Sequence, residues 1–308
     1  VAKKGRVFGG GRRRELPDKK RKEIAAEVMP VLRGLVGTKE HKIGHFDDSP
    51  VPLEFVDSAD APRLAPLGTS CPDHFLRTKI RPLFLDWDPQ TGTVEAIKQL
   101  FADALPEYRK AYAAYYERCK RKDSPPLRDP NPVVVLVPGV GLMTFAKDKS
   151  TARVSAEYFG NAIQVMRGAE AASTYVALEE KEAFGIEYWP LEEAKLKRLP
   201  PEKELARRVA VITGGAGGIG KAIARKFLAA GAHVVILDID PAALGRAAEE
   251  LRPIAGKDRV VTAQADVTNE LDMRRAFDDA CLAFGGVDIV VPNAGIAMVA
   301  PLTEITLE

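Results

Sequence analysis

Apolar residues in the first part of the chain recur at helical spacing in two places and are irregular in between. The spacing predicts one helix from Pro17 to about Gly34 and a longer one from Thr93 to Lys122, in which Pro106 is a candidate break. The stretch from His41 to Leu85 is rich in Pro, Asp and Gly, and it predicts loops and short strands. The first part of the chain therefore mixes helices with short extended segments.

A fully apolar run, Val133 to Val137, marks the middle of the chain and predicts a buried strand. The glycines of Pro138 to Gly141 predict a turn, and Leu142 to Ala146 reads as a second strand. A helix is predicted from Ser150 to Ala172. We expect the hairpin and this helix to pack as one layer against a sheet.

The last third begins with a strand, a tight loop and a helix. From Arg208 to Gly220 the sequence reads RVAVITGGAGGIG, in which a β-branched apolar run meets a cluster of glycines. An amphipathic stretch from Lys221 to Gly231 follows. Further apolar runs, His233 to Leu237 and Val287 to Val291, predict more strands. This order is typical of an α/β fold with a doubly wound parallel sheet.

The glycine cluster has the composition of a nucleotide phosphate site. Gly214 and Gly218 lack a Cβ, so the backbone can turn sharply and approach a pyrophosphate. Gly220 lets the helix lie close to the strand, with its free N–H groups directed at the phosphates. Asp238, at the end of the next apolar run, is the acid that such sites place on a ribose.

The spacing from Thr213 to Gly220, Thr-Gly-x-x-x-Gly-x-Gly, resembles the short-chain dehydrogenase/reductase family. Two later stretches agree with it, Ala265-Asp266-Val267 and Asn293-Ala294-Gly295. The resemblance implies a Rossmann domain that binds NAD. It implies these site residues: Gly214, Gly217, Gly218, Ile219 and Gly220 at the pyrophosphate, Asp238 and Ile239 at the adenosine ribose, Asp266 and Val267 at the adenine, and Asn293, Ala294 and Gly295 beneath the cofactor.

The chain before this domain resembles the bifunctional rhamnulose-1-phosphate aldolase/short-chain dehydrogenase proteins. The similarity lies in three stretches: Gly68 to Lys79 (GTSCPDHFLRTK), Val137 to Gly141 (VPGVG) and Met166 to Glu170 (MRGAE). The resemblance implies a degenerate second copy of the class II aldolase fold. We expect residues 1–36 to be a basic tail and helix ending an upstream aldolase domain, 37–198 the aldolase-like domain, 199–204 a linker, and 205–308 the N-terminal half of the dehydrogenase domain.

Metal-dependent aldolases of that class hold a divalent metal with a His-x-His pair and a later His before Gly. This sequence lacks His-x-His, and Pro138 precedes Gly139 where the later His is expected. We therefore expect zinc or another divalent metal only in an aldolase part upstream of Val1. A separate pattern, His41 and His45 with nearby acids and the Cys71–His74 pair, is either a metal site or a set of polar loop contacts, and we favour the contacts.

Tyr116-x-x-x-Lys120 matches the catalytic motif of the dehydrogenase family, in which the lysine lowers the pKa of a proton-transferring tyrosine. It precedes the cofactor loop by about a hundred residues, whereas the family places this motif after Asn-Ala-Gly. We interpret it as coincidence. No catalytic residue of the dehydrogenase is expected in this chain.

Composition supports a globular protein. Hydrophobic residues make up 46% of the sequence, no apolar run approaches a membrane span, and three scattered cysteines suit a reducing cytoplasm. The net charge is +2, but residues 1–22 hold ten Lys or Arg against two acids. Such a run attracts either nucleic acid or a sugar phosphate, or is a solvated linker and helix start, which we favour. We expect a small-molecule substrate, a homo-oligomer, and no nucleic-acid or membrane partner.

The sequence as a whole predicts a fragment of a cytoplasmic sugar-catabolic enzyme. By resemblance, the parent splits a deoxyketose 1-phosphate, and the dehydrogenase oxidises the lactaldehyde product or a related alcohol with NAD. The fragment alone is expected to be inactive. Two alternatives stay open: a stand-alone NAD-dependent sugar or alcohol dehydrogenase with an accessory domain, and a non-catalytic nucleotide-binding module.

Overall fold

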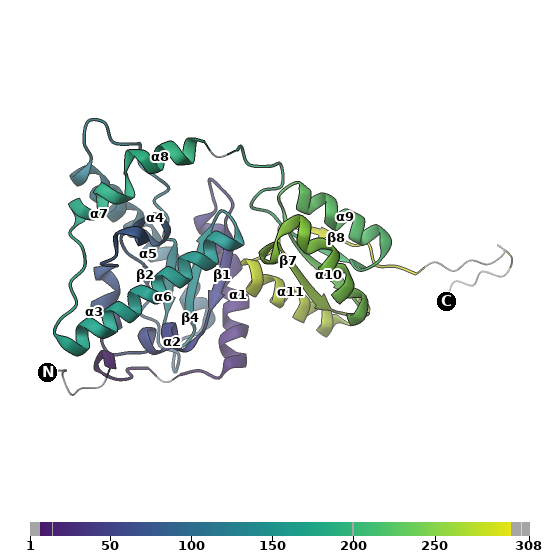
Figure 1. Ribbon diagram of the computed structural model, residues 1–308. Coiled ribbons are helices and arrows are strands. Elements are labelled where there is room, and N and C mark those ends of the chain that lie inside the picture. Colours follow the sequence, from purple (N-terminus) through teal and green to yellow (C-terminus); the bar gives the residue numbers. More distant parts are fainter. Residues whose placement is uncertain (1–6, 14, 199, 297–302, 304–308) are drawn as a thin grey trace.

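Two α/β units follow one another along the chain and lie side by side in the computed structural model (Figure 1), which describes residues 7–13, 15–198, 200–296 and 303. Each unit contains a four-stranded sheet with helices against it. The first unit extends to α8 (Pro190–Lys197), and the second begins after residues 200–207. The sequence also predicts a helix start after Pro301, which lies outside the described residues, as do Leu199 of the linker and four of the basic residues near the N-terminus.

The sheet of the first unit has the order β1-β4-β3-β2. Strands β1 (Ile43–Asp47), β4 (Gly141–Ala146) and β3 (Val134–Val137) are antiparallel neighbours, and the short β2 (Leu83–Phe84) runs parallel to β3. All four residues of β3 are buried, as its apolar run predicts, because both faces of the sheet are covered. The β3–β4 turn uses positive φ angles of 73° at Gly139 and 131° at Gly141, which glycine adopts readily.

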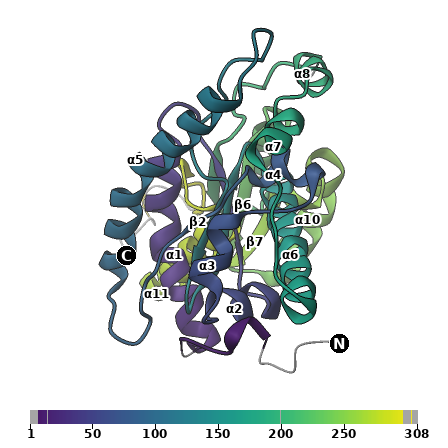
Figure 2. The same ribbon diagram turned by 90° about the vertical axis from the view of Figure 1, so that its left-hand side faces the viewer.

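Helices cover both faces of this sheet (Figure 2). On one face, α1 (Asp18–Val36) and α5 (Val94–Cys119) form a core with β3 and β4. On the other, α6 (Lys149–Ala172) and α2 (Pro50–Val56) form a second core. The remaining helices lie nearer the edge of the unit: α3 (Ala61–Leu64), α4 (Phe75–Thr78) and α7 (Glu180–Glu187).

Several details differ from the sequence-based expectations. Pro50–Val56 is a helix rather than a strand or loop, because a proline in the first helical turn costs no hydrogen bond. Helix α5 continues through Pro106, where Phe101 and Leu105 are packed in the core. The predicted hairpin is confirmed, but it lies within the sheet, and α6 packs upon it. Helix α1 shares its core with α5, β3 and β4.

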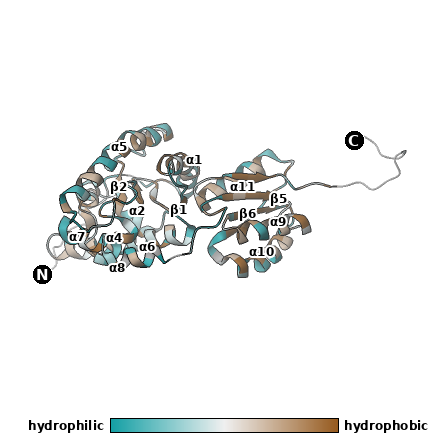
Figure 3. Cartoon of the chain, turned by 90° about the horizontal axis from the view of Figure 1, so that it is seen from above, coloured by the Kyte–Doolittle hydropathy of each residue, from teal (hydrophilic) through white to brown (hydrophobic). Residues whose placement is uncertain are grey.

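The second unit has four parallel strands in the order β7-β6-β5-β8. These strands are β5 (Val209–Thr213), β6 (His233–Asp238), β7 (Val260–Gln264) and β8 (Ile289–Val291). Helices α9 (Gly218–Ala229) and α10 (Pro241–Ala255) pack on one face, and α11 (Glu270–Phe284) packs on the other. Figure 3 shows the hydrophobic strands β5 and β6 between these two layers. The expected partial doubly wound parallel sheet is confirmed.

The two units meet through α11, which lies against α1 and β1. Gly44 of β1 faces Gly285 directly after α11, so the two backbones come close together. Arg33 of α1 donates to Asp288 at 2.6 Å, and both side chains are largely buried. No helix among the described residues is long and apolar enough to span a membrane.

Candidate cofactor-binding site

The site residues predicted from the sequence gather at one edge of the second sheet. The four strands are parallel, so their carboxyl ends meet at the same edge. The glycine loop follows β5, Asp238 ends β6, Asp266 comes two residues after β7, and Asn293 comes two residues after β8. The structure thus brings together segments that are up to 80 residues apart in the chain, as the hydrogen bond between Thr213 and Asn293 shows.

The glycine loop is so close to its neighbours that side chains do not fit. Gly214 has a φ of +61°, and a Cβ there would lie 2.9 Å from the Cα of Ala294. A Cβ at Gly220 would lie 2.2 Å from the carbonyl oxygen of Gly214, and one at Gly215 would lie 2.7 Å from the Cβ of Ile236. Real Cβ atoms essentially never come this close, so these three positions require glycine if the loop is to keep its shape.

Helix α9 begins at the other side of this loop with open space before it. A Cβ added at Gly218 would meet nothing within 4 Å, and the Ile219 side chain is 73% exposed. Gly217 precedes the helix, and no side chain caps it. The first N–H groups of the helix, together with its dipole, make this end suitable for an anionic group.

Asp238 lies next to the loop. Its Oδ2 accepts a hydrogen bond from the backbone N of Ala216 at 3.2 Å, and its Oδ1 accepts one from the N of Asp240 at 3.3 Å. The next side chain, Ile239, is 63% exposed and offers no hydrogen-bonding group. A carboxylate held at this place favours hydroxyl groups and disfavours a phosphate.

Asp266 is oriented by its own loop. Its Oδ1 accepts hydrogen bonds from the N and the Oγ1 of Thr268, at 2.9 and 2.7 Å, and these bonds lower the pKa of the Asp266 carboxyl. Val267, which follows, is 45% exposed at the sheet edge. The apolar Val267 side chain is thus available to a flat ring.

Asn293 ties the segment after β8 to the glycine loop. Its Nδ2 donates to the carbonyl oxygens of Thr213 and Gly214, at 3.0 and 3.2 Å. The backbone N atoms of Asn293 and Ala294 both donate to Thr213 Oγ1, at 3.0 and 2.9 Å. Gly295 has nothing within 4 Å of where its Cβ would be. The amide and hydroxyl together fix the distance between the two loops.

Thr213 is the site residue that the sequence did not single out. It is 5% exposed and accepts both of these backbone hydrogen bonds through one hydroxyl oxygen. Its position as the first residue of Thr-Gly-x-x-x-Gly-x-Gly was the available signal. Pairing β5 with β8 was needed to show what its hydroxyl does.

Tyr116 and Lys120 lie elsewhere, at the end of α5 in the first unit. The Tyr116 hydroxyl donates to the carbonyl of Pro125 at 2.7 Å. Lys120 Nζ is 2.6 Å from Glu117 and 5.8 Å from the centre of the Tyr116 ring. The Tyr116 ring also packs against Phe184 and Tyr188, so among the described residues both members of the motif make only structural contacts within the first unit.

The histidines of the first unit contact different partners. In the described part of the chain, no group of three or more His, Cys, Asp or Glu side chains could hold a metal ion. The nearest polar partners are Arg208 for His41, Lys149 for His45 and Thr69 for His74.

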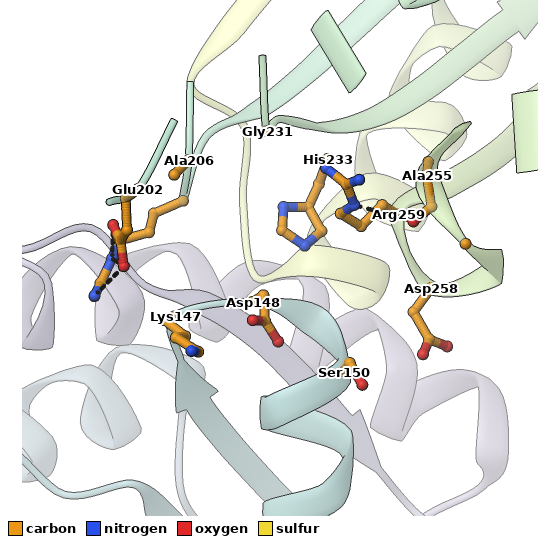
Figure 4. Close-up of a pocket in the computed structure, with 12 residues that line it drawn as sticks. Lys147, Asp148, Ser150, Glu202, Ala206, Gly231, His233, Ala255, Asp258 and Arg259 are labelled. Carbon is orange, nitrogen blue, oxygen red and sulfur yellow. Dashed lines mark hydrogen bonds and ion pairs between the residues drawn. The ribbon is translucent and has the colours of Figure 1, made fainter. Parts of the chain in front are cut away.

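A cavity of about 430 Å³ lies between the two units, at the amino ends of β5, β6 and β7 (Figure 4). His233 and Arg259 line it from the second unit, and Asp148 lines it from the first. His233 is 1% exposed, and its Nε2 accepts a hydrogen bond from the backbone N of Lys149 at 3.1 Å. Burial lowers the pKa of His233 to about 4. This cavity lies at the opposite end of the strands from the glycine loop.

Two family models match the chain. Residues 23–196 match the aldolase class II, second domain family, and residues 208–308 match the short chain dehydrogenase family. These matches follow the two units of the fold.

Known proteins are similar to the whole chain or to about a third of it. The uncharacterized oxidoreductase YuxG of Bacillus subtilis is 43% identical over 302 residues, which are 98% of this chain and 44% of that protein. The L-2,3-butanediol dehydrogenase of Corynebacterium glutamicum is 40% identical over 102 residues, 33% of this chain and 39% of that protein. A solved short-chain dehydrogenase/reductase (glucose/ribitol dehydrogenase) structure from Brucella melitensis has 36% identity and a TM-score of 0.32 over 35% of this chain and 44% of its own.

The chain thus spans less than half the length of each of these proteins. Its two units nevertheless match two family models in sequence and in order. The chain belongs to the family of the aldolase class II second domain, and in it this domain is followed by a short-chain dehydrogenase domain.

Proposed function

We propose that the chain is part of a bifunctional sugar-catabolic enzyme, in which an NAD-dependent dehydrogenase is fused to a rhamnulose-1-phosphate aldolase. The order of the two domains and the aldolase-related stretches of sequence support this pairing. The dehydrogenase would oxidise lactaldehyde or a related alcohol. A relative whose name gives a small diol, L-2,3-butanediol, as its substrate supports a small alcohol or aldehyde.

We assign the cofactor to the carboxyl edge of the second sheet. The glycines of the loop there have no side chains, and open space at Gly218 leaves room for a pyrophosphate. Gly214, Gly217, Gly218 and Ile219 would hold the pyrophosphate at the start of α9. Asp266 and Val267 would contact the adenine, and the segment from Asn293 to Gly295 would lie beneath the nicotinamide half. Bound NAD supplies the hydride acceptor, and these residues position it.

The preference for NAD over NADP depends on Asp238. Its carboxylate lies beside the loop, 3.2 Å from the N of Ala216, where it would accept hydrogen bonds from ribose hydroxyls. A 2′-phosphate there would meet a like charge, which commonly costs several kcal/mol. Ile239 provides no cation to offset that cost.

Titrating the chain with NADH and with NADPH tests this assignment. We expect clear binding of NADH and much weaker binding of NADPH. In Asp238→Ala the difference between the two affinities should be smaller. Asp278→Ala, an exposed change on α11, is the matched control and should leave both affinities unchanged. Equal affinity for the two cofactors in the unaltered chain would overturn the assignment.

We also propose that residues 1–308 alone do not turn over. The sequence holds no Tyr-x-x-x-Lys after Asn293, and general acid-base catalysis contributes a factor of about 10² to 10⁴. NADH formation from lactaldehyde that Asp238→Ala abolishes and Tyr116→Phe leaves intact would contradict this. Detection of NAD binding with no turnover agrees with both proposals.

The other properties follow from the same resemblance. We place zinc or another divalent metal in an aldolase part outside this chain, and we propose a cytoplasmic homo-oligomer acting on small molecules. Light scattering of the chain tests the oligomer. A stand-alone dehydrogenase would be favoured by a parent protein without a His-x-His aldolase domain, and a non-catalytic module by a parent without the catalytic tyrosine and lysine.

A further inference from the structure

A second cavity, of about 210 Å³, lies inside the first unit. It opens where α4, the end of α7 and the first two turns of α6 meet the starts of β1 and β3. Its lining is rich in charge, with four basic and two acidic side chains: Lys42, Arg77, Lys79, Arg128, Asp129 and Glu187. Arg77 and Lys79 belong to the GTSCPDHFLRTK stretch, which the cofactor site does not use.

Lys79 is the most deeply buried of the four cations, at 9% exposure. Its Nζ donates to the backbone carbonyl of Asp129 and lies 3.7 Å from the centre of the Tyr112 ring. Among the described residues, no carboxylate lies within ion-pair distance of it. Burying an ammonium group without such a partner is unfavourable, and this lowers the pKa of Lys79 to about 8.

The backbone at Lys79 is also unusual. Its φ of 60° and ψ of 178° fall where side chains other than glycine are rare. Thr78 Oγ1 lies 3.0 Å from the carbonyl oxygen of Lys79 and 3.1 Å from that of His74, and its one proton serves one of the two at a time. Uncommon backbone of this kind is concentrated at ligand and catalytic sites.

Arg77 provides a second cation, at the rim. Its side chain is exposed and makes no hydrogen bond or ion pair with any residue in the described ranges. Its backbone carbonyl oxygen lies 2.9 Å from Ser155 Oγ, a hydroxyl that is equally close to the carbonyl oxygen of Thr151. Ser155 and Thr151 come from the start of α6, the end at which a helix dipole is positive.

Glu187 balances part of this charge from a distance. It is 2% exposed, and its two oxygens accept hydrogen bonds from Tyr112 at 2.6 Å and Tyr115 at 3.2 Å. Burial raises the pKa of its carboxyl. The Glu187 oxygens thus already have donors, whereas the Arg77 guanidinium has no acceptor among the described residues.

We propose that this cavity binds a small ligand carrying a phosphate or carboxylate group, with Lys79 and Arg77 as the cations that hold it. Both side chains offer only hydrogen-bond donors, which match an oxyanion. The cavity has the volume of about seven water molecules, so it has room for the anionic group and a few carbon atoms. The site lies in the first unit and does not depend on the cofactor assignment.

Calorimetric titration of the whole chain with sulfate and with acetate tests the site, since sulfate represents a tetrahedral phosphate group and acetate a carboxylate. We expect at least one to bind, and Arg77→Ala to weaken that binding at least tenfold. Arg77 has no protein partner, so this variant should melt at the same temperature as the parent. Arg274→Ala, an exposed arginine on α11, is the control. Binding of neither anion, or equal binding by Arg77→Ala, would overturn the proposal.

Proton uptake gives a readout that a structural role for Lys79 would not produce. An anion beside Lys79 raises the lysine pKa, so sulfate binding at pH 8 should take up a fraction of a proton, measured in two buffers with different ionisation enthalpies. The other charged or titratable groups facing Lys79 are Glu187 and Tyr112 from α7 and α5, Asp129 and Arg128 before β3, and Lys42 before β1.

In Lys79→Arg the positive charge remains, but the arginine is already fully protonated at pH 8. Anion binding should therefore persist in this variant without any proton uptake. Lys79→Met should lose both. Uptake that survives in Lys79→Arg would assign the proton to another group and refute the role of Lys79. NADH affinity, which concerns the second unit, should be the same in all of these variants.

Discussion

At Gly220, one missing side chain decides the shape of the phosphate loop. The position faces the carbonyl oxygen of Gly214 at 2.2 Å from where a Cβ would be, and the obstacle is backbone that cannot turn aside. Gly218, two residues earlier, faces open space. Glycine thus has different physical roles at two positions of one motif. It allows close helix packing at Gly220 and leaves room for a ligand at Gly218.

We predict that Gly220→Ala lowers the free energy of unfolding by about 1–3 kcal/mol, because the methyl group forces α9 away from β5. It should also weaken NADH binding, since Asn293 contacts the same loop. Urea unfolding and NADH titration measure the two effects. Gly218→Ala is the folding control and should keep the stability of the parent; an equal loss in both variants would contradict the packing argument.

Between elements, the contact of α11 with β1 depends on two glycines. A Cβ on Gly44 would lie 2.8 Å from the Cα of Gly285 and 2.6 Å from Met29 Cε. Gly285 ends α11 in the left-handed region, with a φ of 84°. The strand of one unit and the helix end of the other can approach this closely only because neither has a side chain there.

Gly44→Ala should therefore loosen the contact between the units. Met29 can move, but the backbone of Gly285 cannot, so we expect a loss of about 1–3 kcal/mol in unfolding free energy and faster proteolysis at residues 200–207. Gly34→Ala on α1, with nothing within 4 Å, is the matched control and should be neutral or more stable by up to about 1 kcal/mol. Unchanged proteolysis of Gly44→Ala would refute the expectation.

Across the whole molecule, His233 connects the two units by a hydrogen bond to the start of α6. Its Nε2 accepts from the N of Lys149, so the ring must be neutral at that nitrogen. His45, beside Lys149 Nζ at 2.8 Å, also has a pKa of about 4 because it is buried. Both histidines bind a proton near pH 6.5 in the unfolded chain and only near pH 4 in the folded one.

This difference predicts acid sensitivity. Between pH 6.5 and 4 the unfolded chain binds protons that the folded chain excludes, so stability is present above pH 6.5 and falls as the pH is lowered. At about 1.4 kcal/mol per pH unit, His233 contributes a loss of about 2 kcal/mol between pH 7.5 and 5. His233→Gln keeps a hydrogen-bond acceptor but does not titrate. This variant should therefore lose about 2 kcal/mol less stability than the parent between pH 7.5 and 5.

Urea unfolding at the two pH values measures this loss. His41→Gln is the control, because the His41 side chain is 47% exposed and its replacement should change the pH dependence less. A His233→Gln variant that loses as much stability as the parent between pH 7.5 and 5 would refute the linkage to His233.

Local patterns predicted much of the fold. The apolar runs gave β3 and the strands of the second unit, since a strand buried on both faces is apolar throughout. The glycine motif gave the loop between β5 and α9, because only glycine fits its backbone. Boundaries were less certain: α9 begins at Gly218 rather than Lys221, since the last residues of the motif already have helical backbone. Pro50–Val56 was misjudged because its apolar residues are too few to show a period.

Neighbours close in the chain are enough to predict the α/β class, the order of the two domains and the positions of the glycine and acid residues. Other contacts become visible only in the folded chain: α1 packs on β3 and β4, Thr213 holds Asn293, Gly44 faces Gly285, and Arg77 and Lys79 share a cavity with Glu187. Those contacts join residues far apart in sequence, and a local pattern carries no information about which distant surface a side chain will meet. Burial, which sets the pKa values of Lys79 and His233, is likewise fixed only when the whole chain is packed.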